Sequence, residues 1–403
     1  MKTTIGVFFG GRSTEHEISV LSASQAMAAI DRRKYDIIPI YITKDGKWFS
    51  GEAMLDVNNF RNLPQLLKWS KQVYMRPEYG DFNLYLEKKP LFRSAVFAHL
   101  DVALPVVHGT NCEDGTFEGV LDTIGIPYAG CNTLASANGM DKITMKMILA
   151  AENIPVVDYV WFTDKQWFAR RDELIAQVES KLSYPVIVKP ANLGSSVGIG
   201  AAHNREELIE KVDSAERYST RLIVEHMVQN MQEINCSVLG DCDDYETSVL
   251  EQPISAGDFL DFDEKYKGGH KGAKGKGMAA SKKIFPAQLP DEETERIKFL
   301  AGETFRVLAC HGVARVDVMI DGNTRQIYVN EINTIPGSLS WYLWDNRGEG
   351  INFTQLIDRL VQLALKRKRE IDRKTTSFDT DILLFGAGAK GAKGAKGLKG
   401  GKF

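Results

Sequence analysis

Residues 313–333, VARVDVMIDGNTRQIYVNEIN, are the most informative stretch of this sequence. Apolar and polar side chains alternate over the first eight positions, which is the period of a half-buried strand. An Asp-Gly dipeptide follows as a hairpin turn signal, and a second run leads back from it. We therefore predict an antiparallel hairpin that presents four polar side chains on one face, namely Arg315, Asp317, Glu331 and Asn333.

Three of these four side chains suit a divalent metal ion. The carboxylates of Asp317 and Glu331 and the side-chain carbonyl of Asn333 are hard oxygen ligands, and Mg²⁺ binds through a few such ligands together with phosphate oxygens. For any one of them, an exposed sheet face with incidental charges is an equally good interpretation. The three together, with Arg315 beside them, favour a magnesium site.

Outward from the hairpin, the chain divides into three predicted domains and a tail. Residues 1–130 open with a strand, a helix and a strand, a pattern that predicts a parallel α/β sheet. Residues 131–228 and residues 229–370 each mix helices and strands in an α+β pattern. Residues 371–403 end in GAK-like triplets, which predict a flexible tail. The predicted fold class is therefore α/β with three domains.

The composition excludes several classes of protein. The chain has 403 residues, of which 43% are hydrophobic and 26% charged, so it is not a disordered chain. No run of about 18 apolar residues occurs, and we expect no membrane insertion. The five cysteines form no CxxC pair, and the N-terminus lacks the cleavage site of a signal peptide. We expect reduced thiols and a cytoplasmic location.

A second group of residues suggests a phosphate-binding site. The loop at residues 194–200, GSSVGIG, follows a strand that contains Lys189, and its small residues let backbone N–H groups approach a phosphate. The loop is neither a Walker A sequence nor a Rossmann fingerprint, so alone it is a weak signal. Lys142, at the start of a helix, strengthens it. Glu15 follows the first strand at its carboxyl end, where open α/β sheets bind ligands.

These segments together resemble the ATP-grasp ligases, and within them the D-alanine–D-alanine ligase family. The resemblance covers nearly residues 1–370. Eight motifs in the family's order carry it: Gly10-Gly-Arg-Ser-Thr-Glu15-His-Glu-Ile-Ser, His108-Gly-Thr-Asn-Cys-Glu113-Asp-Gly, Met140-Asp-Lys142, Val188-Lys189-Pro, Gly194-Ser-Ser-Val-Gly, Glu264-Lys265-Tyr266, Arg315-Val-Asp317 and Glu331-Ile-Asn333-Thr-Ile-Pro-Gly337.

The resemblance implies an ATP-grasp fold whose two α+β domains enclose the nucleotide. The residues that it implies for the phosphates are Lys142, Lys189 and Lys265. Those for adenine and ribose are Glu225, the backbone as far as Val228, and Glu233. Those for two Mg²⁺ (or Mn²⁺) ions are Asp317, Glu331 and Asn333.

The resemblance also implies the reaction and the residues around the substrates. Two D-alanines would be joined through a D-alanyl phosphate with release of ADP and phosphate, for peptidoglycan synthesis, by an enzyme that is commonly a homodimer. The residues implied for catalysis are Glu15, Ser195, Tyr266, Arg315 and the Gly337 N–H, and those for substrate binding are His108, Tyr342 and Leu343. Tyr342 stands where the family commonly has a serine, so D-serine, D-lactate or another second substrate stays open.

The distribution of lysine allows one alternative from another class. The formal net charge is −3, but residues 265–283 and 386–403 contain lysines and no acidic residue, so the remainder is acidic. A polybasic segment binds nucleic acids or anionic surfaces with a strong salt dependence. The tail has no aromatic residue except Phe403 among these lysines, so we expect no nucleic-acid partner.

Overall fold

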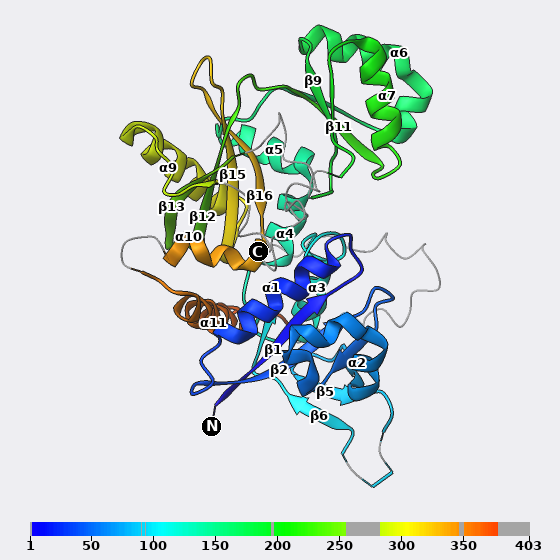
Figure 1. The fold of residues 1–403 in the computed structure, drawn as a ribbon, viewed down its shortest axis with the longest axis vertical. Coiled ribbons are helices and arrows are strands. Elements are labelled where there is room, and N and C mark those ends of the chain that lie inside the picture. Colours follow the sequence, from blue (N-terminus) through cyan, green and yellow to red (C-terminus); the bar gives the residue numbers. More distant parts are fainter. Residues whose placement is uncertain are drawn as a thin grey trace, which may run out of the picture.

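A seven-stranded sheet occupies the N-terminal part of the computed structural model, which describes residues 2–89, 91–92, 94–194, 197–254, 283–345 and 350–377 (Figure 1). Its order is β6-β5-β4-β3-β2-β1-β7. The strands are β1 (Thr3–Gly10), β2 (Tyr35–Ile42), β3 (Trp48–Ser50), β4 (Lys71–Met75), β5 (Asn83–Leu86), β6 (Val96–His99) and β7 (Val102–Pro105). Strand β1 is parallel to β2 and β7, which confirms the predicted parallel opening, whereas β3 to β6 extend the sheet antiparallel.

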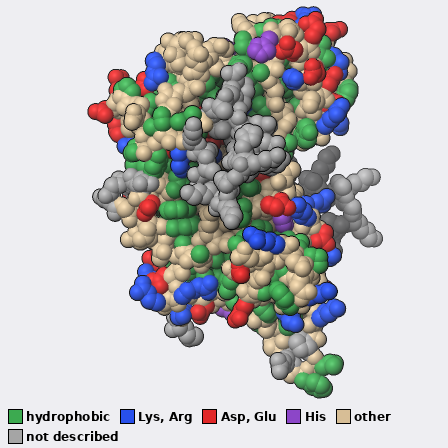
Figure 2. Space-filling view, in the orientation of Figure 1, with side chains coloured by type: hydrophobic (Ala, Val, Ile, Leu, Met, Phe, Trp, Pro, Cys, Tyr) green, Lys and Arg blue, Asp and Glu red, His purple; other side chains and the backbone are tan. Residues whose placement is uncertain are grey.

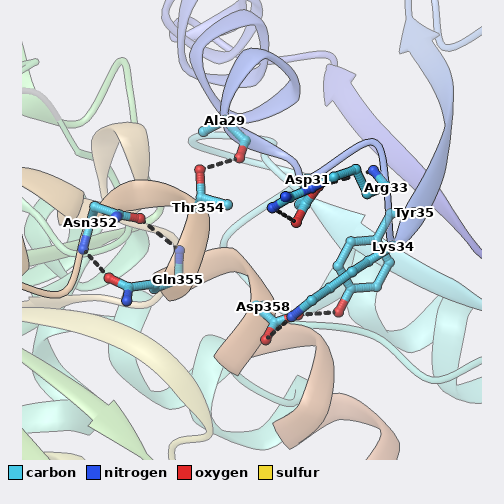
Figure 3. A network of polar contacts seen from close by, with 9 residues as sticks. All are labelled: Ala29, Asp31, Arg33, Lys34, Tyr35, Asn352, Thr354, Gln355 and Asp358. Atoms are coloured by element: carbon cyan, nitrogen blue, oxygen red, sulfur yellow. Dashed lines mark hydrogen bonds and ion pairs between the residues drawn. The ribbon is translucent and has the colours of Figure 1, made fainter.

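Helix α11, from near the end of the chain, packs on this N-terminal sheet. The helices of this part are α1 (His16–Ala29), α2 (Leu63–Trp69), α3 (Thr116–Ile124) and α11 (Phe353–Ile371), with 3₁₀ turns η1 (Glu52–Leu55) and η2 (Val57–Asn62). Apolar residues of α11 belong to the N-terminal core. Figure 3 shows the polar contacts at this junction, where Asp358 accepts from Lys34 and from the Tyr35 hydroxyl, and Thr354 donates to the Ala29 carbonyl.

The second sheet has four antiparallel strands, in the order β10-β9-β11-β8. The elements are β8 (Tyr159–Thr163), α6 (Asp164–Lys181), β9 (Val186–Pro190), β10 (Gly200–Ala202), α7 (Arg205–Ala215) and β11 (Arg221–His226). Helix α6 begins with a capping box, in which Thr163 and Gln166 satisfy each other's backbone N–H groups. Both helices lie to one side of the sheet in Figure 1, and their apolar residues pack on it in a separate core.

A five-stranded antiparallel sheet contains the predicted hairpin. Its strands are β12 (Gln232–Gly240), β13 (Tyr245–Pro253), β14 (Lys283–Ile284), β15 (Gly312–Ile320) and β16 (Ile327–Asn333), in the order β14-β13-β12-β15-β16. The helices near it are α4 (Thr133–Met140), α5 (Lys142–Ala151), α9 (Asp291–Val307), the 3₁₀ turn η4 (Gly337–Ser340) and α10 (Trp341–Asp345). The hairpin prediction is confirmed, and its loop is longer than a two-residue turn because Asp321 accepts from the N–H groups of Asn323 and Thr324.

The three sheets correspond in sequence to the three predicted domains, but the packing of α11 crosses the division. The described residues give three sheets and no division of the chain into domains, so the boundaries at 130, 228 and 370 stay predictions. No helix in the described part of the chain is long and apolar enough to span a membrane. On the face seen in Figure 2, acidic and basic side chains are interspersed over the described surface.

Candidate functional site

A row of polar side chains crosses the five-stranded sheet. Strand pairing places Glu251 opposite Asn235, Asn235 opposite Asp317, and Asp317 opposite Glu331. Directly paired residues point to the same side of a sheet, so these four side chains share one face, and we call them the polar row. Arg315 pairs with Asn333 two positions along the same face. The opposite face holds apolar residues of β15 that pack against α9.

Arg315 and Asp317 form a bidentate ion pair within this face. The Arg315 guanidinium donates to the two carboxylate oxygens of Asp317 at 2.6 and 2.7 Å, and Asn333 Nδ2 donates to Asp317 Oδ2 at 3.1 Å. Burial alone would lower the pKa of Arg315, but Asp317 raises it well above its usual value. Arg315 is therefore a fixed cation beside two carboxylates.

The donor set fits the metal ions that the family resemblance implies. Asp317 and Glu331 are neighbours across the hairpin, and Asn333 lies one residue pair away on the same face. Two carboxylates and an amide oxygen leave coordination positions for phosphate oxygens, which is how Mg²⁺ is usually held. The described residues contain no group of three or more His, Cys, Asp or Glu side chains that could hold a metal ion, and the hairpin supplies two carboxylates with one amide.

Three lysines lie close to the Glu331 end of the polar row or to the buried Glu225. Two of them, Lys142 and Lys189, were predicted, and the third was not. Lys142 Nζ donates to the Leu193 carbonyl at 2.9 Å and lies 3.2 Å from a carboxylate oxygen of Glu331. Lys189 Nζ lies 2.7 Å from one carboxylate oxygen of Glu225. Lys146, the unpredicted one, lies 3.4 Å from the other.

The carboxylate of Glu225 is wholly buried between these ammonium groups. Burial alone would raise the pKa of Glu225, but Lys146 and Lys189 outweigh burial and lower it to about 2. The carboxylate is thus charged and already occupied. Its backbone lies one residue before the end of β11.

Val228 and Glu233 lie where β11 ends and β12 begins. Val228 packs in a small apolar cluster with Val157 and Met319. Glu233 pairs with Met319 in register and lies on the same strand face as Asn235, two positions away. The two residues therefore combine an apolar surface with a carboxylate, next to the buried Glu225.

Loops of the N-terminal sheet meet the segment after β16. The Ser22 hydroxyl contacts His108 Nε2 and accepts from the Ser338 N–H, both at 3.1 Å. Burial lowers the pKa of His108 to about 4, so its imidazole is neutral near pH 7. Gly337 begins the turn η4 at this contact.

Glu15, which is buried, and Glu113, which is partly buried, are two carboxyl groups in the same region. Glu15 is the N-cap residue of α1 and is 7% exposed. It lies close to Gly194, where an added Cβ would come within 3.2 Å of a Glu15 carboxylate oxygen. Glu113 accepts from the Gly109 N–H at 2.8 Å, and burial together with the charge of Glu15 raises its pKa.

Tyr342 lies at the Glu251 end of the polar row. Its hydroxyl donates to Glu251 at 3.4 Å, and the Lys283 ammonium lies 3.8 Å from the centre of its ring and 3.0 Å from Glu251. Leu343 is fully buried. Ser195, Lys265 and Tyr266 lie outside the described residues.

The sequence analysis missed Lys146, Asn235, Glu251 and Lys283 as site residues. A signal for Lys146 exists, since it follows Lys142 by four positions and so lies on the same face of a helix. Asn235 alternates with Glu233 in a strand. Glu251 and Lys283 have no such signal, because their place depends on which strands pair.

Comparison with known proteins gives the same family for both halves of the chain. A family described as "D-ala D-ala ligase N-terminus" matches residues 4–131, and one described as "D-ala D-ala ligase C-terminus" matches residues 148–362. A D-alanine–D-alanine ligase from Thermosipho melanesiensis is 39% identical over 95% of this chain and 99% of its own. A D-alanine–D-alanine ligase from Natranaerobius thermophilus is 40% identical over 94% of this chain and 99% of its own.

Solved structures agree. The D-alanine–D-alanine ligase from Coxiella burnetii is 29% identical, with a TM-score of 0.75 over 92% of this chain and 96% of its own. The VanG D-Ala:D-Ser ligase from Enterococcus faecalis is 31% identical, with a TM-score of 0.75 over 90% and 100%. The predicted ATP-grasp fold is thus confirmed, and on its sequence as on its structure the chain belongs to the D-alanine–D-alanine ligase family.

Proposed function

We propose that the polar row and the residues around it are where this ATP-dependent D-alanine–D-alanine ligase joins two D-alanines for peptidoglycan synthesis. The observation that carries the proposal is the register that brings Arg315, Asp317, Glu331 and Asn333 onto one face, next to Lys142. A carboxylate is a poor electrophile, so the reaction needs a phosphorylated intermediate. An arginine beside oxygen ligands and lysines suits that chemistry.

The lysines serve the phosphates of ATP. Lys142 and Lys189 bring ammonium groups close to Glu331 and to the end of β16. Lys265, which lies outside the described residues, is assigned to the phosphates by the family resemblance. The apolar cluster around Val228 takes the adenine against the backbone after Glu225, and the Glu233 carboxylate accepts from the ribose hydroxyls. Adenine is a flat apolar ring with a polar edge, which such a strand end accommodates.

Asp317, Glu331 and Asn333 hold two Mg²⁺ (or Mn²⁺) ions when ATP is bound. The metal ions supply charge neutralisation of the phosphates. Asp317 is held in place by its bidentate pair with Arg315, and Glu331 by its pair with Lys142. These pairs fix the carboxylates before the nucleotide arrives, which reduces the reorganisation needed for phosphoryl transfer.

The substrates meet at Arg315. Glu15 holds the ammonium of the first D-alanine, and the family resemblance assigns Ser195 and Tyr266, which lie outside the described residues, to the same step. The carboxylate of that D-alanine attacks the terminal phosphorus while ADP leaves. The amine of the second D-alanine then attacks the acyl phosphate, loses a proton, and expels phosphate. Arg315 and the Gly337 N–H stabilise the oxyanion between these steps, a contribution of about 3–4 kcal/mol per donor.

The second substrate binds between His108, Tyr342 and Leu343. A second candidate is a ligase that takes D-serine or D-lactate there, which the similarity to a D-Ala:D-Ser ligase favours. We further propose a homodimer in the cytoplasm, where ATP is available. Light scattering of the purified protein gives the mass that tests the dimer.

A substrate panel tests the function. Purified protein is incubated with ATP, Mg²⁺ and D-alanine, alone or with D-serine or D-lactate, and released phosphate and product masses are measured. We expect phosphate release and a D-alanyl-D-alanine mass with D-alanine alone. No phosphate release would overturn the proposal, and a mixed product in excess over D-alanyl-D-alanine would favour the second candidate.

A further inference from the structure

Lys146 is a lysine with no exposed surface in the interior of the protein. It lies on α5, one turn after Lys142. A buried ammonium group costs several kcal/mol unless a counter-charge compensates it. Its counter-charge is Glu225, at 3.4 Å. Among the described residues neither Lys146 Nζ nor the facing Glu225 oxygen has an aligned hydrogen bond, so the pair is held by charge.

Glu225 divides one negative charge between two ammonium groups. Its Oε2 accepts from Lys189 at 2.7 Å, while its Oε1 faces Lys146. Lys189 also donates to the side chain of Asn330 at 3.3 Å, on the strand that carries Glu331. Lys189 therefore bridges the buried carboxylate and strand β16, next to Glu331.

Five charged groups lie in two neighbouring sets of ion pairs, Lys142 with Glu331, and Lys146 and Lys189 with Glu225. The hydrogen bond from Lys189 to Asn330, the residue before Glu331, links the two sets, and we call the five groups together the cluster. The ammonium groups are Lys142, Lys146 and Lys189, and the carboxylates are Glu225 and Glu331. Three positive and two negative charges leave a surplus of one positive charge. If Lys146 were uncharged, Glu225 would neutralise Lys189 alone and the surplus would vanish.

We propose that Lys146 is a positioning residue for the nucleotide: by sharing the charge of Glu225, it leaves the positive charge of Lys189 available to the phosphates of ATP. Lys146 itself is too buried to touch the nucleotide. The inference rests on the proposed function, since it assumes that Lys142 and Lys189 face the ATP phosphates. It goes beyond that function because it assigns a role to the charge of a residue behind them.

A merely structural lysine predicts different behaviour. If Lys146 only fills and stabilises the interior, Lys146→Met lowers the melting temperature and leaves the affinity for ATP as it is. If its charge sets the surplus, ATP affinity follows the net charge of the cluster. The surplus is one in the native protein, zero in Lys146→Met, one in Lys146→Met/Glu225→Gln, and two in Glu225→Gln.

The experiment measures nucleotide binding and kinetics in these four proteins. Calorimetry with a non-hydrolysable ATP analogue and Mg²⁺ gives binding without the ligase reaction, so it reports on the inference even where the ligase assay fails. Steady-state assays give KM for ATP and for D-alanine. Lys366→Met is the control, because it removes a lysine of α11 that pairs with Asp241 and lies outside the cluster.

We expect Lys146→Met to weaken analogue binding and raise KM for ATP at least ten-fold, with KM for D-alanine within two-fold of the native value. The double variant should return to within three-fold of native. Unchanged ATP affinity in Lys146→Met, or a double variant no better than the single one, would overturn the inference. If Lys146→Met does not fold, Glu225→Gln, with a surplus of two, must bind the analogue more tightly than the native protein, and equal or weaker binding would overturn the inference.

Discussion

Glu331 is the residue on which most of the proposed site depends. It faces Asp317 across the hairpin and pairs with Lys142 at 3.2 Å, so one carboxylate joins the metal ligands to the phosphate-binding lysines. Glu331→Gln keeps volume and hydrogen bonding and removes the charge. We expect normal folding and a loss of turnover of at least about 100-fold, because phosphoryl transfer depends on charge neutralisation and positioning.

Kinetics and a melting curve of Glu331→Gln check this prediction together. A variant with the native melting temperature and near-native turnover would remove the metal assignment. A variant that loses turnover and also fails to melt cooperatively would show that the carboxylate serves the fold instead.

We expect Glu118, on α3, to make the free energy of unfolding depend on pH. It is 1% exposed, one of its oxygens has no partner among the described residues, and burial raises its pKa well above the ordinary 4.5. As the pH rises past 4.5, the unfolded carboxyl loses its proton while the folded one keeps it. The free energy of unfolding therefore falls with pH, by about 1.4 kcal/mol per pH unit, until the folded-state pKa is passed.

Glu118→Gln removes this titration. We expect the stability gained by the variant over the native protein to grow between pH 5.5 and 8.5 in urea unfolding. A difference between the two proteins that stays constant over that range would mean that Glu118 titrates normally in the fold.

At the scale of elements, the turn η4 holds three consecutive residues in the left-handed region. Ser338, Leu339 and Ser340 have φ values of 50°, 54° and 50°. For residues with a Cβ this conformation costs roughly 1–2 kcal/mol each. Ser340 is fully buried, and its hydroxyl has no partner among the described residues. The strain lies directly after Gly337, where the oxyanion contact is proposed.

We expect Ser340→Gly to be more stable than Ser340→Ala by about 1 kcal/mol, the reverse of the order found inside helices. Chemical denaturation of the two variants measures the difference. If alanine proves the more stable residue there, the turn is not left-handed in solution.

Helix α11 ties the end of the described chain to the N-terminal part through Arg367. The guanidinium donates to the carbonyls of Tyr128 and Gly130 at 3.0 Å and lies 4.1 Å from the centre of the Tyr128 ring. We expect Arg367→Met to cost about 3 kcal/mol, because it leaves buried carbonyls without donors. The neighbouring Lys366→Met, which breaks a half-exposed ion pair, should cost less than about 1 kcal/mol. Equal losses in denaturation experiments would show that these carbonyl contacts contribute little.

Helices and strands could be predicted where a single segment shows a clear periodicity of apolar residues. The opening strand, helix and strand, and the 313–333 hairpin, follow from local periodicity and turn residues, and both are present. The short antiparallel strands β3 to β6 were not predicted, because runs of three to five residues show little period.

The same limit holds within the site. The common face of Arg315 and Asp317 follows from a period of two, whereas the neighbours of that face depend on pairing between distant strands. Glu251 joins the polar row only because β13 pairs with β12, and β12 with β15. Lys146 and Glu225 lie on separate elements, α5 and β11, so their ion pair depends on tertiary packing.

At the scale of the whole molecule, three sheets converge on one set of residues. The N-terminal sheet contributes Glu15 and His108, the second sheet Lys189 and Glu225, and the third sheet the polar row. Contacts such as that of Ser22 with the Ser338 N–H join the first and third parts directly. An enzyme that must hold ATP and two amino acids together needs contributions of this kind from several elements.

In the proposed reaction, a D-alanine carboxylate is phosphorylated by ATP before the second D-alanine attacks it. D-alanine labelled with oxygen-18 in its carboxylate tests this directly, with mass spectrometry of the nucleotide, the phosphate and the dipeptide. Because the attacking oxygen stays with phosphorus when phosphate leaves, we predict one labelled oxygen in inorganic phosphate and no label in ADP. D-alanyl-D-alanine keeps all the other labelled oxygens. Label in AMP, or unlabelled phosphate released together with dipeptide, would contradict the account.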